Sequence, residues 1–138
     1  MINYKAMKQT ISNRVFLELL EKQPYKTPIQ VVIYLALEYY FNLKKNDQSF
    51  GVTISYCIKN RIREEAIEEN DVDGYLFEHE IAKKILIYEL EEQAHVERVE
   101  DVFFWALEAF AKSDSTYGNK IARQIVDLVE FEERRLIN

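Results

Sequence analysis

Cysteine, proline and glycine are scarce in this sequence, which has one cysteine, two prolines and three glycines in 138 residues. The single cysteine, Cys57, excludes an internal disulfide and is typical of proteins from a reducing compartment. It lies in an apolar run, so we expect it to pack in the core. We therefore expect a cytoplasmic protein that folds without covalent cross-links.

Long apolar runs and sequence repeats are missing as well. The N-terminal stretch MINYKAMKQTISNR lacks an apolar core of signal-peptide length. The most apolar run, Ile29–Leu37, is far shorter than the roughly 20 residues that span a bilayer. No repeat of roughly 20 to 50 residues, which would indicate a solenoid, is evident. We expect no membrane association and a single helical domain over residues 1–138.

Helical periodicity predicts an all-α fold, a compact bundle of five to six helices. The first helix covers about residues 8–22 and ends before Pro24. At TPIQ, Thr27 can cap the next helix, Pro28 needs no amide partner there, and Gln30 can close a capping box. This second helix is apolar nearly all round, as expected at the centre of a bundle. The last helix follows SDSTYG and turns an apolar face inward.

Two segments can be read in two ways. Residues 52–58 alternate like a strand, yet Ile54, Ile58 and Ile62 recur at helical spacing. Because a strand needs a partner and no second strand is evident, we favour a helix from about Val52 to Glu69. Residues 75–112 form one long helix or two, and a bend near 94–97 would let both pieces share a core. The apolar stripe of the first piece comprises Phe77, Ile81, Ile85 and Tyr88.

Charge is divided unevenly along the chain. The net charge is −6, but residues 1–63 carry ten basic and four acidic side chains, whereas residues 64–138 carry eight basic and twenty acidic ones. The densest segment, Glu64–Glu80, has eight acidic residues in seventeen and no Lys or Arg; we call it the acidic corner. Such a field attracts basic partners and repels nucleic acid.

Part of the acidic corner resembles an EF-hand calcium loop. Residues 69–80, ENDVDGYLFEHE, place acidic side chains at the first, third, fifth and twelfth positions and Gly74 at the sixth. However, the first ligand is a glutamate, the ninth position is Phe77, and no second copy exists. The residues are equally explained by helix capping and by acidic side chains in a first helical turn. We predict no metal site here.

A second metal pattern is Glu92-Gln93-Ala94-His95, whose Glu-x-x-His spacing supplies ligands to paired metals in helical bundles. Such sites require two of these motifs and two further glutamates. Only one motif is present, although Glu38 and Glu108 interrupt apolar helical runs. Glycine-rich phosphate loops and nucleophile elbows are absent too. We predict that the protein is not an enzyme, has no catalytic residues and uses no cofactor.

Consecutive aromatic residues at 39–41 (YYF) and 103–105 (FFW) cannot all face one core. At least one ring in each set should lie near the surface, either as rim packing or as an anchor for a partner.

These observations favour a non-catalytic acidic protein that binds and inhibits or neutralises a basic protein. A bacterial immunity protein, or a phage or plasmid inhibitor of a nucleic-acid enzyme, would have this size and charge. The predicted contact residues are Glu64, Glu65, Glu68, Glu69, Asp71, Asp73, Glu78 and Glu80.

Two alternatives use the basic half of the chain. In the first, the protein is a helical regulator that binds nucleic acid through Lys44, Lys45, Lys59, Arg61 and Arg63. In the second, it is a homodimeric structural subunit in which the basic half of one copy meets the acidic half of its twin.

Overall fold

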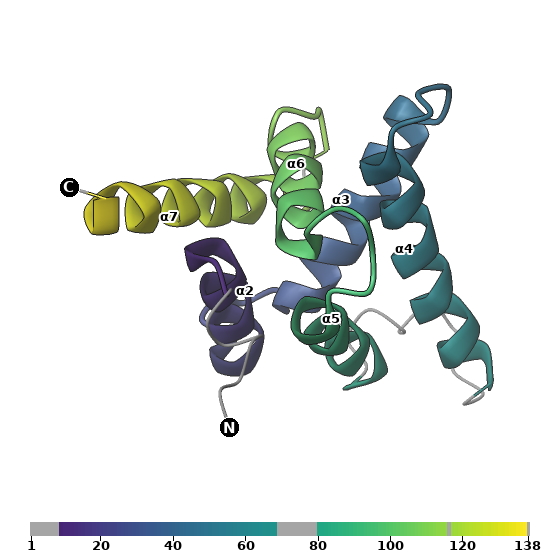
Figure 1. The fold of residues 1–138 in the computed structure, drawn as a ribbon, viewed down its shortest axis with the longest axis horizontal. Coiled ribbons are helices and arrows are strands. Elements are labelled where there is room, and N and C mark those ends of the chain that lie inside the picture. Colours follow the sequence, from purple (N-terminus) through teal and green to yellow (C-terminus); the bar gives the residue numbers. More distant parts are fainter. Residues whose placement is uncertain (1–8, 69–79, 116, 138) are drawn as a thin grey trace.

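One apolar core joins all the helices of the computed structural model (Figure 1). The structure describes residues 9–68, 80–115 and 117–137. Within these ranges there are six helices and no strand, which confirms the predicted all-α bundle. The helices are α2 (Ile11–Lys22), α3 (Ile29–Lys44), α4 (Phe50–Glu68), α5 (Glu80–Glu92), α6 (Val99–Ala111) and α7 (Asn119–Ile137).

Helix α3 lies at the centre, as its nearly uniform apolar surface predicts. It contacts each of the other five helices, and its contact with α6 is the most extensive between any two helices. Residues 29–34 of α3, together with Ala36 and Leu37, are all buried. From α6, Phe103 is fully buried and meets Phe16 of α2 edge to face, with ring centroids 5.8 Å apart.

Residues 52–58 belong to helix α4, as we favoured. Ile54, Ile58 and Ile62 are buried along one side, whereas Tyr56, which strand alternation would place with Ile54, is exposed. The predicted core position of Cys57 is wrong, because this residue is exposed. At 100° per residue, Cys57 points away from the isoleucine row.

Of the two readings left open for residues 75–112, the described part has two helices, since α5 ends at Glu92 and α6 begins at Val99 with a turn near residues 94–97. Gln93 adopts the left-handed conformation at φ 52° and ends α5. The placement of Tyr88 on the buried stripe is wrong, since 48% of this residue is exposed. The neighbouring Glu89 is buried instead. Phe77, the first residue of that stripe, lies outside the described residues.

The capping box predicted at the start of α3 is wrong. Thr27 makes no capping bond; instead the side chain of Gln23 reaches across from the end of α2. Its Oε1 accepts a 2.9 Å hydrogen bond from the Ile29 N–H, and its Nε2 donates to Oε1 of Gln30 at 2.8 Å and to the Leu20 carbonyl at 2.7 Å. Gln23 is left-handed at φ 48°, and the sharp turn brings its amide to the first turn of α3.

The same turn occurs a second time at the α5–α6 connection, 70 residues later. Gln93 accepts from the Val99 N–H at 3.1 Å and donates to Glu100 at 2.7 Å and to the Leu90 carbonyl at 2.8 Å. Each of these atoms has its counterpart in the Gln23 turn. The fold is therefore built from two related halves, α2–α3–α4 and α5–α6–α7.

The helix packing follows the same twofold relation. The first helix of each half packs on the third helix of the other half: α2 on α7 and α5 on α4. Within α4 and α7, both 19 residues long, buried Ile54, Ser55 and Ile58 match buried Ile125, Val126 and Val129 at a shift of 71. The chain thus resembles a symmetric pair of three-helix units whose outer helices are exchanged.

Candidate functional site

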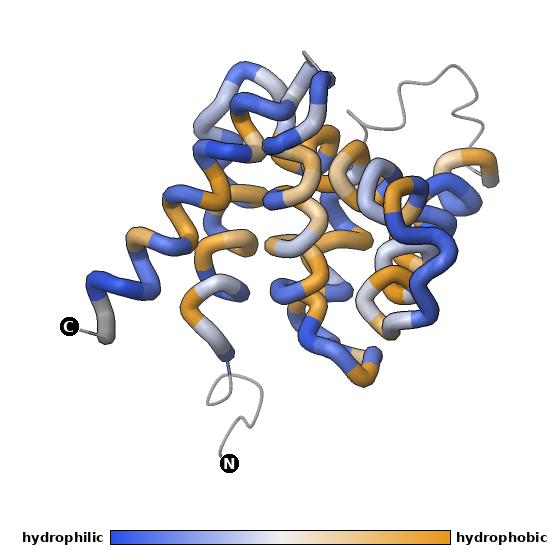
Figure 2. The backbone as a smooth tube through the Cα atoms, turned by 90° about the horizontal axis from the view of Figure 1, so that it is seen from above, coloured by the Kyte–Doolittle hydropathy of each residue, from blue (hydrophilic) through white to orange (hydrophobic). Residues whose placement is uncertain are grey.

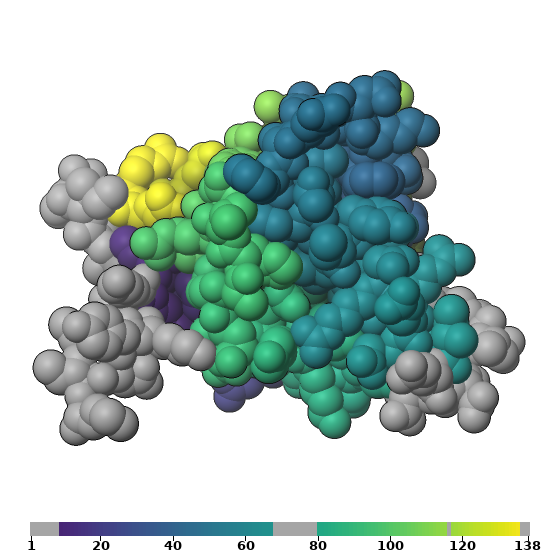
Figure 3. All heavy atoms as spheres, turned by 45° about the vertical axis from the view of Figure 1, so that its right-hand side comes forward, coloured from purple at the N-terminus to yellow at the C-terminus, as the bar shows by residue number. Residues whose placement is uncertain are grey.

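The described part of the acidic corner lies at the end of α4 and the start of α5. Glu64, Glu65 and Glu80 are exposed there, and Glu68 is the last residue of α4. These two helices are in contact and lie side by side on one face of the molecule (Figure 3). The remaining predicted contacts, Glu69, Asp71, Asp73 and Glu78, lie outside the described residues, as does nearly all of the calcium-loop resemblance.

Some carboxylates elsewhere in the molecule are neutralised by ion pairs, whereas none of the exposed carboxylates in the described part of the acidic corner is. On α2, Glu18 pairs with Lys22 at 2.7 Å, and on α7, Glu132 pairs with Arg135 at 2.9 Å. No ion pair between described residues involves Glu64, Glu65 or Glu80. Glu64 accepts a 3.0 Å hydrogen bond from the neutral amide of Asn60, which leaves its charge in place.

A buried carboxylate joins α4 to α5 beside this surface. Oε1 of Glu89 accepts from Arg61 at 3.0 Å, and its Oε2 lies 2.8 Å from Nε2 of His95. The guanidinium of Arg61 also stacks on the ring of Tyr88, 4.8 Å from its centroid. Both carboxylate oxygens are thus occupied, as a buried charge requires.

Sequence inspection missed this cluster, although one signal was present. Glu89 falls in the apolar register of α5, four residues after Ile85 and directly before Leu90, both buried. A charged residue at such a position indicates a buried ion pair.

The basic residues of the nucleic-acid alternative do not share one surface. Lys59 lies over the Tyr56 ring at 5.5 Å, and Arg63 is near enough to Tyr34 of α3 to lower the pKa of that phenol. Arg61 instead lies against α5. Lys44 and Lys45 are exposed at the end of α3. A run that is compact in sequence is therefore divided by the helical twist.

The residues considered for a metal pair are not brought together. His95 contacts Glu89, and Glu38 lies near Tyr34. In the described ranges no three His, Cys, Asp or Glu side chains are close enough to hold a metal ion. Burial raises the pKa of Tyr34, with a smaller contribution from the Glu38 carboxylate, while Arg63 opposes the shift.

A second buried carboxylate, Glu100, ties the start of α2 to the α5–α6 turn. It is 1% exposed and accepts from Thr10 at 2.7 Å, from Asn13 at 3.1 Å and from Gln93 at 2.7 Å. Burial raises the pKa of the adjacent Asp101, and repulsion from Glu100 adds to the effect. Because its partners come from the two halves of the chain, we assign Glu100 a structural role.

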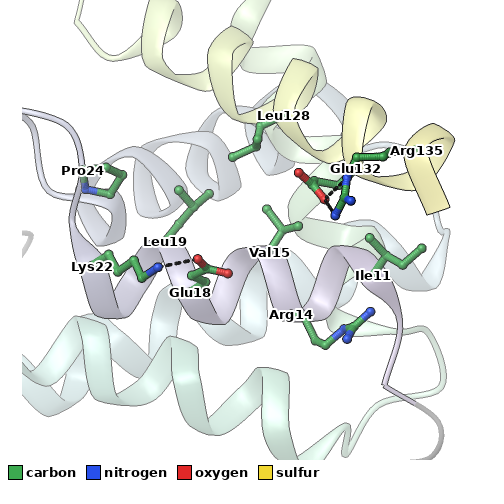
Figure 4. Close-up of a pocket in the computed structure, with 10 residues that line it drawn as sticks. All are labelled: Ile11, Arg14, Val15, Glu18, Leu19, Lys22, Pro24, Leu128, Glu132 and Arg135. Carbon is green, nitrogen blue, oxygen red and sulfur yellow. Dashed lines mark hydrogen bonds and ion pairs between the residues drawn. The ribbon is translucent and has the colours of Figure 1, made fainter.

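A groove of about 640 Å³ runs between α2 and α7 (Figure 4). Val15, Leu19 and Leu128 point into it from the two helices. The pairs Glu18–Lys22 and Glu132–Arg135 lie along its edges, each within one helix. No ion pair between described residues crosses it.

Both aromatic runs bring a ring near the surface, as predicted. Trp105 is 38% exposed, and Phe41 is half-buried against Tyr56, with ring centroids 4.7 Å apart. Trp105 covers Gly51 at the start of α4, where an added Cβ would lie 2.9 Å from its Cζ3. In part these rings pack helix against helix.

Comparisons with known protein families, with characterised proteins and with solved structures find no significant match. In the part of the chain that the structure describes, no helix is both long and apolar enough to cross a membrane.

Proposed function

We propose that this protein is a non-catalytic interaction protein whose acidic corner binds a basic surface on another protein and neutralises it. Inhibition of a nucleic-acid enzyme, as by an immunity protein or a phage or plasmid inhibitor, is the role that this chemistry suits best. The supporting observation is the concentration of exposed carboxylates in the most acidic segment of the chain. Glu64, Glu65 and Glu80 are exposed there and have no ion-pair partner among the described residues.

The packing of α4 on α5 explains how such a surface would be held. The buried Glu89 carboxylate of α5 binds Arg61 of α4, about one turn before Glu64 and Glu65, and so fixes the two helices against each other; His95 of the α5–α6 turn occupies its other oxygen. Carboxylates on rigid helices keep their spacing, and fixed negative charge accelerates encounter with a basic surface. The helices fix the backbone positions of these carboxylates, so only their side chains have to be ordered on binding.

The test is a pull-down with two charge-matched variants. The first, Glu64→Gln/Glu65→Gln/Glu80→Gln, removes three exposed carboxylates of the acidic corner. The control, Glu18→Gln/Glu21→Gln/Glu91→Gln, removes three exposed carboxylates from α2 and α5. We expect the wild type and the control to retain the same basic protein, and the first variant to lose it. Equal retention by all three proteins, or capture of nucleic acid by them, would refute the proposal.

A further inference from the structure

The C-terminal turns of α7 extend beyond the helix's buried face. Among the α7 side chains that the structure describes, Val129 is the last buried one, yet the helix continues to Ile137. Figure 2 shows this end running away from the rest of the bundle. Within these turns, Arg134 forms an ion pair with Glu130 at 3.7 Å, and Arg135 forms one with Glu132 at 2.9 Å. These turns therefore gain little stability from packing against the core.

An aromatic ring lies at the middle of this exposed surface. Phe131 is 58% exposed, on the side of α7 opposite Ala122, Ile125 and Val129. One turn before it is exposed Asp127, and one turn after it are exposed Arg134 and Arg135. Asp127 has no ion-pair partner among the described residues.

We propose that two copies of this chain bind each other along α7, antiparallel and about Phe131. A twofold axis near Phe131 places each residue opposite one equally far from Phe131 on the other side. Asp127 of one copy then faces Arg135 of its twin, beside the twin's Arg134. The twofold axis repeats this contact with the two copies exchanged. Among the exposed Asp127, Arg134 and Arg135, opposite charges therefore meet only when the helices run in opposite directions, while Glu130 and Glu132 remain paired with Arg134 and Arg135 of their own helix.

The groove between α2 and α7 provides the apolar part of this contact. Leu128 and Arg135, three and four residues from Phe131, both line it. The ring of Phe131 therefore lies at the edge of its own copy's groove, and the twofold operation brings it to the mouth of its twin's. There Val15, Leu19 and Leu128 offer apolar surface from two helices. A buried aromatic ring surrounded by charge pairs is typical of the centre of a protein interface.

Comparison of the two halves supports a specialised role for this groove. At the related α5–α4 contact, Glu89 and Arg61 form an ion pair that joins the helices. Their counterparts in α2 and α7, at shifts of 70 and 71, are Leu19 and Glu132, which cannot pair. The charged residues beside the groove pair along their own helices instead. Of these two related contacts, the one beside Phe131 has no ion pair or hydrogen bond between described side chains of its two helices.

This dimer does not rest on the proposed function. It uses α2 and α7, whereas the acidic corner lies on α4 and α5. It also differs from pairing of the basic half with the acidic half, since Asp127, Phe131, Arg134 and Arg135 all belong to the second half.

Sedimentation equilibrium over a hundredfold range of concentration tests the proposal. We expect the wild type to dimerise and Phe131→Ser to raise the dissociation constant by roughly thirtyfold or more, the effect of truncating a central aromatic anchor. Tyr117→Ser, at a comparably exposed ring (55%) before the start of α7, should dimerise like the wild type. A wild type that stays monomeric throughout, or a Phe131→Ser protein that dimerises as tightly, would overturn the proposal.

Charge reversal tests the antiparallel register. Asp127→Lys alone, and Arg134→Glu with Arg135→Glu, should each weaken the dimer by placing like charges opposite each other. The triple variant should regain much of the lost affinity, because the reversed charges again face opposite ones. Circular dichroism on each variant confirms that α7 stays helical. If a well-folded triple variant recovers none of the lost affinity, this arrangement is overturned.

Discussion

Gln23 and Gln93 each fasten two consecutive helices with a single side chain. Each accepts from the first N–H of the next helix and donates to a carbonyl of the preceding one and to a buried acceptor in the next. The amide is well suited to this task because it carries both donors and an acceptor. Both residues have positive φ, so the turn keeps its bonds despite a backbone conformation that glutamine seldom adopts.

Replacing either glutamine by alanine should therefore destabilise the protein. Gln23→Ala leaves the Ile29 N–H without its capping acceptor, and we expect a loss of about 1–3 kcal/mol in the free energy of unfolding. Gln93→Ala should cost more, because it also removes a donor from the buried Glu100 carboxylate. Urea denaturation measures both values. Gln48→Ala, at an exposed position, should change stability little, and an equally small effect at Gln93 would contradict the assigned role.

Asp101 predicts a pH dependence of stability. Burial raises the pKa of this carboxyl in the folded state, and repulsion from the Glu100 carboxylate raises it further. The folded protein therefore holds the proton to higher pH than the unfolded chain does. The stabilising effect of the neutral form is complete below the unfolded pKa and is lost as pH rises through the folded one.

Asp101→Asn should consequently gain stability relative to the wild type as pH rises from about 4 to 7, since asparagine stays neutral throughout. Parallel thermal denaturation of the two proteins at each pH measures the difference. A difference that does not change with pH would show that Asp101 has the same pKa in both states.

Helix α4 and the bend before α6 show how far the sequence predicts the elements. The isoleucine row at 54, 58 and 62 fitted a helix, and the lack of a second strand decided in favour of α4. The break near residues 94–97 was one of two open readings, and the structure shows it. Cys57 and Tyr88 were wrongly placed because apolar character does not fix which side of a helix is buried. The side is set by neighbouring helices, which the local pattern does not name.

The twofold relation and the glutamine turns were missed for a different reason. Over residues 10–44 and their counterparts at 80–114, only eight of 35 positions are identical, too few to reveal a repeat by inspection. These are Ile11, Leu20, Glu21, Gln23, Val32, Ala36, Leu37 and Glu38. The capping rules also favour Ser, Thr and Asp near a helix start, so Thr27 was preferred over a glutamine from the preceding helix. Of the predicted site, only Glu64, Glu65 and Glu80 can be assessed for side-chain exposure.

The junction of α4 with α6 provides a prediction for Gly51. An alanine there would bring its Cβ to 2.9 Å from the Trp105 ring, so the ring must move. We expect Gly51→Ala to destabilise the protein by about 1–3 kcal/mol, despite the better helix propensity of alanine. Trp105 is the only tryptophan, so its fluorescence reports the displacement directly.

Truncating the ring should reverse the sign of this effect. With Trp105→Ala as the background, Gly51→Ala should become stabilising, because only the helix-propensity gain remains. If Gly51→Ala destabilises both backgrounds equally, the close approach to Trp105 is not its cause.

The whole molecule combines a symmetric core with an asymmetric surface. Over the described residues, the two halves share helix order, turn chemistry and packing around one core. The surfaces of the halves have diverged. Glu64, Glu65 and Glu80 are exposed on α4 and α5 without an ion-pair partner among the described residues, while α7 presents an exposed ring between opposite charges. The two proposals assign one partner to each surface.

Binding through the acidic corner is tested most directly by the salt dependence of association. The basic protein retained in the pull-down would be purified and its association rate constant measured by stopped flow at increasing ionic strength. For the wild type, we expect the rate constant to fall by about tenfold or more between low and physiological salt, because steering is screened. Glu64→Gln/Glu65→Gln/Glu80→Gln should associate more slowly at low salt and respond less to it. Wild-type association that is independent of salt, or identical in this variant, would contradict the proposed role of the acidic corner.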